Sequence, residues 1–290
     1  MKKIILALYC FFLSLAVYSN DNILIQVDGK KHSSISMEDI KKMSSINIEH
    51  FNYVTQRAEL YKGVGTLAFI EKLYPEAANI LEIEFIAEDN YRSFITVDRL
   101  RQTNSILAYD RADGDKFVRF SLKEKILVSV GPLYLVWDLK GVKKEERLVH
   151  SSVYQIRTIN LLTNKIDFGL KENAVDSSVY LGYQVYKRQC ISCHALGKIG
   201  GSYSFDLVAR KTLELKGAEY VRKYILDPRS VNPRSKMLPL PKFKNAPEMV
   251  QGLLDFLKFM QNPEELLNQK KAASSEASYK VLKELIKEIK

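Results

Sequence analysis

The sequence predicts two domains, an N-terminal α+β domain over residues 20–175 and a C-terminal all-α domain over residues 176–262. Short strand-like runs separated by turn residues fill the first region, and longer amphipathic helical patterns fill the second. The charge balance also changes between the two regions. A leader at residues 1–19 and a helical tail at residues 263–290 complete the predicted organisation.

Residues 1–19 are typical of a secretory signal peptide. A basic start precedes an apolar run over residues 4–17, which is too short to span a membrane comfortably. Cleavage is expected after Ser19, with retention of the segment as an uncleaved anchor as the alternative. Cleavage would remove Cys10 and leave two cysteines. The leader therefore predicts export to the periplasm.

The N-terminal domain is expected to contain several strands and one helix. The helix is predicted near residues 65–73, and turns are predicted at Asp28-Gly29 and Asp113-Gly114. The expected strands are Ile23–Val27, Ile80–Ile86, Arg92–Val97, Lys116–Ser121, Ile126–Val130, Leu133–Leu139 and Val153–Leu161. This mixture of strands with a helix predicts the α+β class for the region.

The most informative motif lies near the start of the C-terminal region, in the run Cys190-Ile191-Ser192-Cys193-His194. Two thiols three positions apart can each form a thioether with one vinyl group of the same porphyrin. The histidine that follows is then placed to ligate the iron. The motif predicts one covalently attached haem c.

Two other interpretations of the cysteine pair are less well supported. A structural zinc site uses four ligands from two such knuckles, and the chain has no second cysteine pair. A thioredoxin-like redox dithiol has no need of the adjacent histidine. Covalent haem attachment also agrees with export.

Met237 is the expected sixth ligand of the haem iron. It lies in the segment Asp227–Pro241, whose four prolines describe a stiff, non-helical loop. Met249 and Met260 fall in an amphipathic helical pattern that indicates core packing. The rival histidines are His32, His50 and His150, all of them far upstream.

Residues 176–262 resemble a small class I mono-haem cytochrome c. The matching features are helices expected near Gly182, Ala218–Leu226 and Ala246–Gln261, the attachment motif and a glycine-rich loop that follows it. The resemblance implies that the first and last helices cross at Gly182. One departure lies at Ser204-Phe205, where the family usually has Gly-Pro and the proline carbonyl accepts a hydrogen bond from the ligand histidine.

The N-terminal region resembles the molybdopterin-binding domain of the sulfite-oxidase superfamily. The similar segments, in order, are Tyr61–Leu67, Ala87–Tyr91, Ile106–Tyr109 and Gly131–Trp137. In that superfamily a cysteine thiolate holds the molybdenum, and no cysteine lies between Asp21 and Arg188. Molybdopterin is therefore not expected, and the superfamily's enzyme activity does not carry over. An unrelated α+β domain remains the alternative.

Charge is concentrated in the C-terminal region. Residues 21–175 carry 22 Lys and Arg against 22 Asp and Glu, whereas residues 176–290 carry 20 against 12. A basic surface suits docking to a redox partner protein with an acidic face. Nucleic acid is not an expected partner, and membrane association is not required.

Together these features predict a periplasmic electron carrier with no catalytic residues, in which the N-terminal domain serves as a docking or scaffold module. Two alternatives stay open. One is a molybdopterin-dependent, sulfite-dehydrogenase-like oxidoreductase with a fused acceptor cytochrome. The other is a haem-based redox sensor or assembly factor, which would require Met237 to dissociate from the iron.

Overall fold

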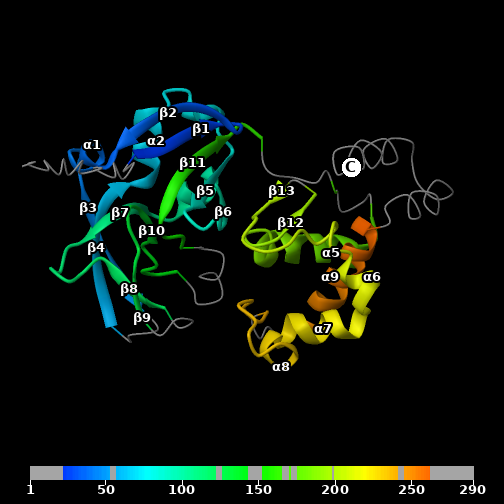
Figure 1. Ribbon diagram of the computed structural model, residues 1–290. Coiled ribbons are helices and arrows are strands. Elements are labelled where there is room, and N and C mark those ends of the chain that lie inside the picture. The colour runs from blue at the N-terminus through cyan, green and yellow to red at the C-terminus, as the bar shows by residue number, and fades with distance from the viewer. Residues whose placement is uncertain are drawn as a thin grey trace, which may run out of the picture.

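The structure is a computed structural model that describes residues 22–52, 57–121, 126–142, 152–164, 170, 175–197, 199–240 and 245–261. The expected signal peptide with Cys10, the expected helical tail and His150 lie outside these residues. The described chain has an N-terminal part, residues 22–164, and a C-terminal part, residues 175–261 (Figure 1).

Five strands form the first sheet, in the order β2-β1-β11-β5-β6. Their bounds are Asn22–Val27 (β1), Lys30–Ser36 (β2), Glu82–Ala87 (β5), Arg92–Thr96 (β6) and Ile156–Leu162 (β11). Strands β1 and β11 run parallel, and the other neighbours are antiparallel. The parallel pair brings the beginning and the end of the N-terminal part together in one sheet.

A second, antiparallel sheet has the order β10-β7-β4-β3. Its strands are Ile46–Asn52 (β3), Arg57–Gly65 (β4), Ser105–Arg111 (β7) and Tyr134–Trp137 (β10). Strands Val118–Ser121 (β8) and Ile126–Ser129 (β9) form a separate antiparallel pair. The helices of the N-terminal part are Met37–Lys41 (α1), Thr66–Leu73 (α2), Ala77–Asn79 (η1) and Val97–Gln102 (α3).

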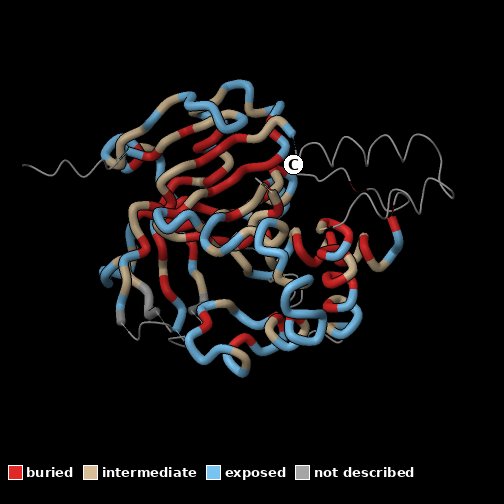
Figure 2. Tube along the Cα trace, turned by 45° about the vertical axis from the view of Figure 1, so that its right-hand side comes forward, coloured by how far each residue is buried: buried red, intermediate tan, exposed pale blue. Residues whose placement is uncertain are grey.

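The main core of the N-terminal part receives alternate side chains of the strands, because successive residues of a strand point to opposite faces. Ile83 and Phe85 of β5 are buried in this core beside Trp137. Glu82 and Glu84 alternate with them and are buried as well, so both faces of β5 are covered. Figure 2 shows buried positions running along the strands and along helices of the C-terminal part.

The C-terminal part is mainly helical. Its elements are Ser177–Val185 (α5), Tyr186–Cys190 (η2), Ala195–Leu196 (β12), Ile199–Gly200 (β13), Thr212–Lys216 (α6), Ala218–Leu226 (α7), Pro228–Val231 (α8) and Ala246–Gln261 (α9). The helices α7 and α9 have the predicted bounds. The segment expected to be wholly non-helical before Met237 begins with the short helix α8, which Asp227 caps by accepting from the backbone N–H of Ser230.

Helices α5 and α9 cross in close contact. A Cβ added to Gly182 would lie 1.9 Å from the carbonyl oxygen of Gly252, and one added to Gly252 would lie 2.8 Å from the carbonyl oxygen of Ser178. Both positions therefore require glycine. Tyr183 and Phe256 pack beside the crossing, with ring centroids 5.9 Å apart. The expected approach of the first and last helices at Gly182 is confirmed.

The predicted fold class, an α+β domain followed by an all-α domain, is wrong. The C-terminal part contains the antiparallel pair β12 and β13, because Gly197 adopts a φ of 65° and lets the chain reverse where an irregular loop was expected. Phe94 of β6 also packs against the core of the C-terminal helices. The described chain is a mixed α/β structure with extensive sheets, and its described residues form no separate all-α domain.

Candidate cofactor site

The cysteine motif lies where α5 gives way to a wider helical turn. In η2 the backbone N–H of Ile191 donates to the carbonyl of Tyr186 at 3.0 Å, which is the spacing of a π-helical turn. The N–H groups of Cys193 and His194 then donate to the carbonyl of Cys190 at 3.1 and 2.9 Å. The two cysteines and the histidine therefore come from one compact turn, and both cysteines are free thiols.

His194 is buried, with 8% of its surface exposed, and one ring nitrogen is already bonded. Its Nδ1 lies 2.9 Å from the carbonyl oxygen of Phe205. Because a carbonyl can only accept, Nδ1 carries the proton and the lone pair remains on Nε2. Burial lowers the pKa of His194, against the opposing effects of this hydrogen bond and of Asp206. The neutral imidazole thus has Nε2 available as a metal ligand.

The chain after the motif folds back onto it and supports it from one side. Gly201 donates its N–H to the carbonyl of Ile191 at 2.7 Å, and Ser204 donates to the carbonyl of Cys193 at 2.8 Å. A Cβ on Gly201 would lie 2.0 Å from the carbonyl oxygen of Ser192, so only glycine fits there. The hydroxyl of Tyr186 donates to the carbonyl of His194 at 2.8 Å. These contacts leave the turn little room to move.

The pKa values of the two thiols are raised, which disfavours the reactive thiolate form that a redox dithiol uses. Burial, and then the neighbouring Cys193, raise the pKa of Cys190 to about 12. Burial, followed by the charge of Asp89, raises the pKa of Cys193 to about 11. A reactive redox dithiol has instead a lowered pKa. Within the described residues no group of three or more His, Cys, Asp or Glu side chains could hold a metal ion.

Met237 lies between α8 and α9 in a segment held by hydrogen bonds. Its backbone N–H donates to Oγ of Ser235 at 3.2 Å, and the Tyr224 hydroxyl donates to the same oxygen at 2.9 Å. Farther along, Leu240 donates its N–H to the carbonyl of Ile225 at 2.9 Å. The segment is thereby attached to α7. Met237 and Cys190 are both partly buried against the same hydrophobic core.

The rival ligands in the described residues have other surroundings. Met260 is 1% exposed in the core of the helices, and Met249 packs at its edge. His32 and His50 lie in β2 and β3 of the N-terminal part. Their rings make edge contacts with Tyr74 at 5.4 Å and Tyr61 at 6.3 Å, respectively. Neither histidine is placed with the cysteine motif.

The N-terminal part contacts the motif through residues that the sequence analysis did not identify. The backbone N–H of Arg92, at the start of β6, donates to the carbonyl of Ser192 at 3.1 Å. These residues lie about a hundred positions apart in the chain, and no local pattern in either segment signals the contact.

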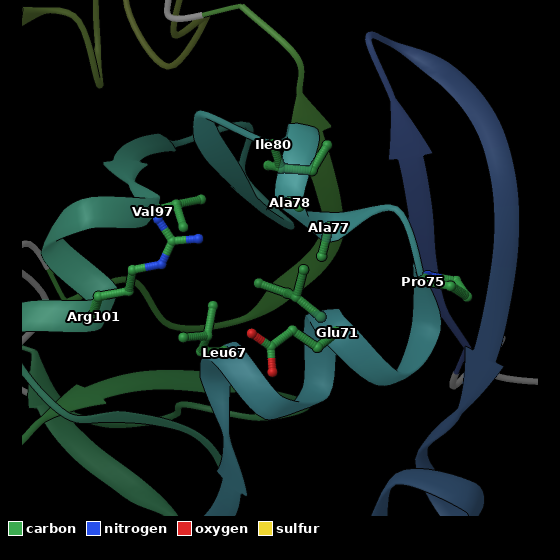
Figure 3. A pocket seen from close by; sticks show the side chains of 9 residues that line it. Leu67, Glu71, Pro75, Ala77, Ala78, Ile80, Val97 and Arg101 are labelled. Atoms are coloured by element: carbon green, nitrogen blue, oxygen red, sulfur yellow. The ribbon is translucent and has the colours of Figure 1, made fainter.

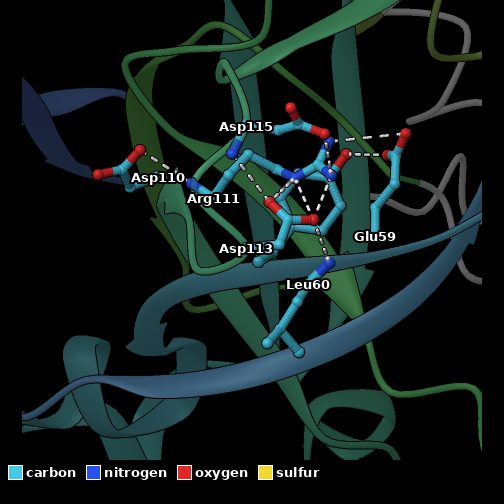
Figure 4. Close-up of polar contacts among 7 residues, drawn as sticks. Glu59, Leu60, Asp110, Arg111, Asp113 and Asp115 are labelled. Atoms are coloured by element: carbon cyan, nitrogen blue, oxygen red, sulfur yellow. Dashed lines mark hydrogen bonds and ion pairs between the residues drawn. The ribbon is translucent and has the colours of Figure 1, made fainter.

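A polar cluster in the N-terminal part surrounds Arg111, whose side chain is 6% exposed (Figure 4). Its guanidinium pairs with Asp113, and it lies 3.6 Å from carboxylate oxygens of both Glu59 and Asp115. The Tyr61 hydroxyl donates to Glu59 at 2.6 Å. The charges of the cluster are thus engaged with one another. The cluster links β4 to the end of β7.

A cavity of about 290 Å³ lies between α2, η1 and α3 in the N-terminal part (Figure 3). Its lining is largely apolar, with Glu71 and Arg101 as the charged members. The remaining lining residues are Leu67, Ile70, Pro75, Ala77, Ala78, Ile80 and Val97. None of these side chains is a cysteine or a histidine, so the cavity offers no thiolate or imidazole ligand for a metal.

The chemistry of the donors around the cysteine motif fits a covalently attached haem. Two unpaired thiols leave one turn, and the adjacent imidazole keeps Nε2 free. A thioether-bearing segment packs against the same core. Thioether attachment needs the two thiols, and axial ligation of the iron needs the imidazole and the methionine thioether.

No protein-family model matches the sequence, and no curated protein matches it either. None of the helices in the described part of the chain combines the length and the apolar composition that a membrane span requires.

Proposed function

We propose that the protein is an exported electron-transfer protein that carries one covalent haem c. Cys190 and Cys193 form the two thioether bonds, and His194 and Met237 are the axial ligands. The observation that carries this proposal is the hydrogen bond from His194 Nδ1 to the carbonyl of Phe205, beside two free thiols on the same turn. It leaves Nε2 as the only free ring nitrogen of a buried, neutral histidine.

The residues around the motif have positioning roles in this proposal. The Phe205 carbonyl orients the imidazole and raises its basicity as a ligand. Tyr186 and Gly201 hold the backbone of the turn, and the loop that carries Met237 is attached to α7 by Ser235. The haem would supply the storage of one electron. Histidine and methionine together would leave no axial position open, which favours electron transfer over substrate chemistry.

The charge of the chain supports a partner with an acidic face. Residues 176–290 carry 20 Lys and Arg against 12 Asp and Glu, whereas residues 21–175 are balanced. Opposite charges accelerate encounter between redox partners, and salt weakens the attraction. The N-terminal part then serves as a docking or scaffold module. The absence of any cysteine from Asp21 to Arg188 removes the thiolate that a molybdenum site of the sulfite-oxidase type would use.

The proposal is tested on the full chain, expressed with its leader in a host that attaches c-type haem. We expect one iron per chain, a c-type pyridine haemochrome spectrum and haem that stays with the polypeptide on a denaturing gel. Replacing Cys190 and Cys193 by serine should abolish covalent haem. Haem that acidified solvent extracts from the wild-type protein would contradict the proposal.

Metal analysis of the same preparation separates the carrier from the enzyme alternative. Iron without molybdenum is the expected result. Molybdenum near one per chain, with reduction of the protein's own haem by sulfite, would make the chain an oxidoreductase. Carbon monoxide or nitric oxide binding to the native reduced protein would instead favour a sensor, because the gas must displace Met237.

A further inference from the structure

The cavity between α2, η1 and α3 has an apolar floor that belongs to the main core of the N-terminal part. Ile70, Ile80 and Val97 line the cavity and are buried in that core. The wall that η1 contributes has only methyl side chains, those of Ala77 and Ala78, and this leaves the space open. The volume of about 290 Å³ lies close to the lower limit for small-molecule sites, which is about 300 Å³. Because its floor is part of the core, the cavity keeps its shape, and its size suits one small molecule.

Two opposite charges lie at this cavity on different helices. Glu71 is exposed on α2 and Arg101 is exposed on α3, and these two helices contact each other. Figure 3 shows the Arg101 guanidinium and the Glu71 carboxylate both extending toward the cavity. Among the described residues, Glu71 has no ion-pair partner, and the ion pair of Arg101 is an exposed contact with Asp98 at 3.5 Å. Most N–H donors of the guanidinium and both oxygens of the Glu71 carboxylate are therefore available to a ligand.

A ligand with a single charge gains from only one of these side chains. An anion would be attracted by Arg101 and repelled by Glu71, and a cation would experience the reverse. A zwitterion instead places its carboxylate at the guanidinium, which binds carboxylates through two parallel hydrogen bonds, and its ammonium group at the Glu71 carboxylate. An apolar substituent then buries its surface on the floor of the cavity, which is favourable in water. The lining therefore fits a molecule with both charges at one end and an aliphatic group at the other.

We propose that this cavity binds a free α-amino acid with a branched aliphatic side chain. Arg101 binds its carboxylate, Glu71 binds its ammonium group, and Ile70, Ile80 and Val97 contact its side chain. The inference does not rest on the proposed haem, because all of these residues belong to the N-terminal part. It gives that part of the chain a binding activity of its own besides the docking role.

Equilibrium dialysis of the full chain against four labelled probes tests the proposal. Leucine carries both charges and the aliphatic group, 4-methylpentanoate lacks the ammonium group, 3-methylbutylamine lacks the carboxylate, and glycine lacks the side chain. We expect one site for leucine and affinities at least about tenfold weaker for the other three probes, because each lacks a charge-assisted hydrogen bond or a buried aliphatic group. Absence of bound leucine at millimolar concentration, or equal affinities for leucine and any other probe, would overturn the proposal.

Two variants that remove a charge assign the role of each side chain. Arg101→Gln should weaken leucine binding about tenfold without weakening the binding of 3-methylbutylamine. Glu71→Gln should weaken leucine binding without weakening the binding of 4-methylpentanoate. A misfolded variant would lose all probes together, so this crossed pattern separates a lost contact from a lost fold. Lys72→Gln is the matched control, because Lys72 is exposed on α2 and does not line the cavity. Its affinity for leucine should equal that of the wild type.

A variant that fills the cavity gives an independent test. The larger side chain of Ala78→Leu would occupy the space above the floor, so this variant should lose leucine binding while its circular dichroism spectrum stays that of the wild type. Unchanged leucine affinity in both Arg101→Gln and Ala78→Leu would show that the amino acid does not bind here. Leucine binding and covalent haem are measured separately on the same preparation, so either proposal can fail while the other stands.

Discussion

The carbonyl oxygen of Phe205 accepts a hydrogen bond from Nδ1 of His194 at 2.9 Å, although no proline fixes the backbone at this position. The next residue fixes the backbone instead. Oδ1 of Asp206 accepts from the backbone N–H groups of Val208 and Ala209 at 2.8 and 2.9 Å. This side-chain cap holds the turn in shape and keeps the Phe205 carbonyl aimed at the imidazole.

Replacing Asp206 by alanine should therefore raise the reduction potential of the proposed haem. A weaker Nδ1–H···O bond makes the imidazole a poorer donor to the oxidised iron. A hydrogen bond is worth about 0.5–1.5 kcal/mol, which corresponds to roughly 20 to 60 mV for one electron. Redox titration measures the shift. Asp206→Asn keeps an acceptor for the two N–H groups and should shift the potential less, and equal shifts would argue against the cap.

Met237→Ala should remove the weak far-red band that sulfur ligation gives an oxidised haem, and it should lower the potential. Optical spectroscopy and redox titration of the purified full chain measure both effects. Met249→Ala is the control, because Met249 is also partly buried against the core of the helices. A band that survives in Met237→Ala and disappears in Met249→Ala would reassign the sixth ligand.

Gly182→Ala should destabilise the protein, because the new Cβ would lie 1.9 Å from the carbonyl oxygen of Gly252. Helices α5 and α9 would have to separate, and overpacking of this kind costs about 1–3 kcal/mol. Denaturant unfolding followed by circular dichroism measures the loss. Gly65→Ala is the matched control, because its Cβ would meet no atom nearer than 3.8 Å. Equal denaturant midpoints of unfolding for Gly182→Ala and Gly65→Ala would contradict the close crossing of α5 and α9.

Asp113→Asn should destabilise the protein at neutral pH and have no effect in strong acid. The Arg111 guanidinium lowers the pKa of Asp113 from 3.8 to about 2. Because the folded-state pKa is depressed, the contribution is complete above pH 3.8 and is lost as pH falls toward 2. The carboxylate is partly exposed, so solvent screening limits the effect to about 1 kcal/mol.

Urea unfolding of the wild type and Asp113→Asn at pH 7 and near pH 2 measures this difference. Asp115→Asn serves as the control, because Asp115 is 81% exposed and lies 3.6 Å from Arg111. Asp115→Asn should change the urea midpoint at pH 7 much less than Asp113→Asn does. A wild-type advantage over Asp113→Asn that is as large near pH 2 as at pH 7 would show that the ion pair is not its source.

Several elements were predictable because their signals are local. Helices α7 and α9 carry apolar residues at helical spacing, and in β1 the buried residues Ile23 and Ile25 alternate with less buried ones before the turn at Asp28 and Gly29. The motif from Cys190 to His194 predicts its chemistry from spacing alone, since five consecutive residues must lie on one turn. The covalent haem and the Met237 ligand stay predictions that the experiments above address.

Strands β2, β3, β4 and β7 were not predicted. Strand β2 is largely polar and the first five residues of β7 are all buried, so neither strand alternates clearly in polarity. The pairing of these strands with their neighbours is a property of the assembled sheets. The hairpin of β12 and β13 depends likewise on a positive φ at Gly197. Its two-residue strands are too short to leave a pattern. That hairpin and the packing of Phe94 are what made the all-α prediction wrong.

The sequence by itself determined the spacing of the two thiols and the histidine in the cysteine motif, the bounds of α7 and α9, and the uneven charge. The tertiary structure alone decided how the motif is held. The hydrogen bond from the backbone N–H of Arg92 to the carbonyl of Ser192 joins segments about a hundred residues apart. Local patterns report what a residue's near neighbours in the chain require, whereas a contact between distant segments depends on where the intervening sheets place them.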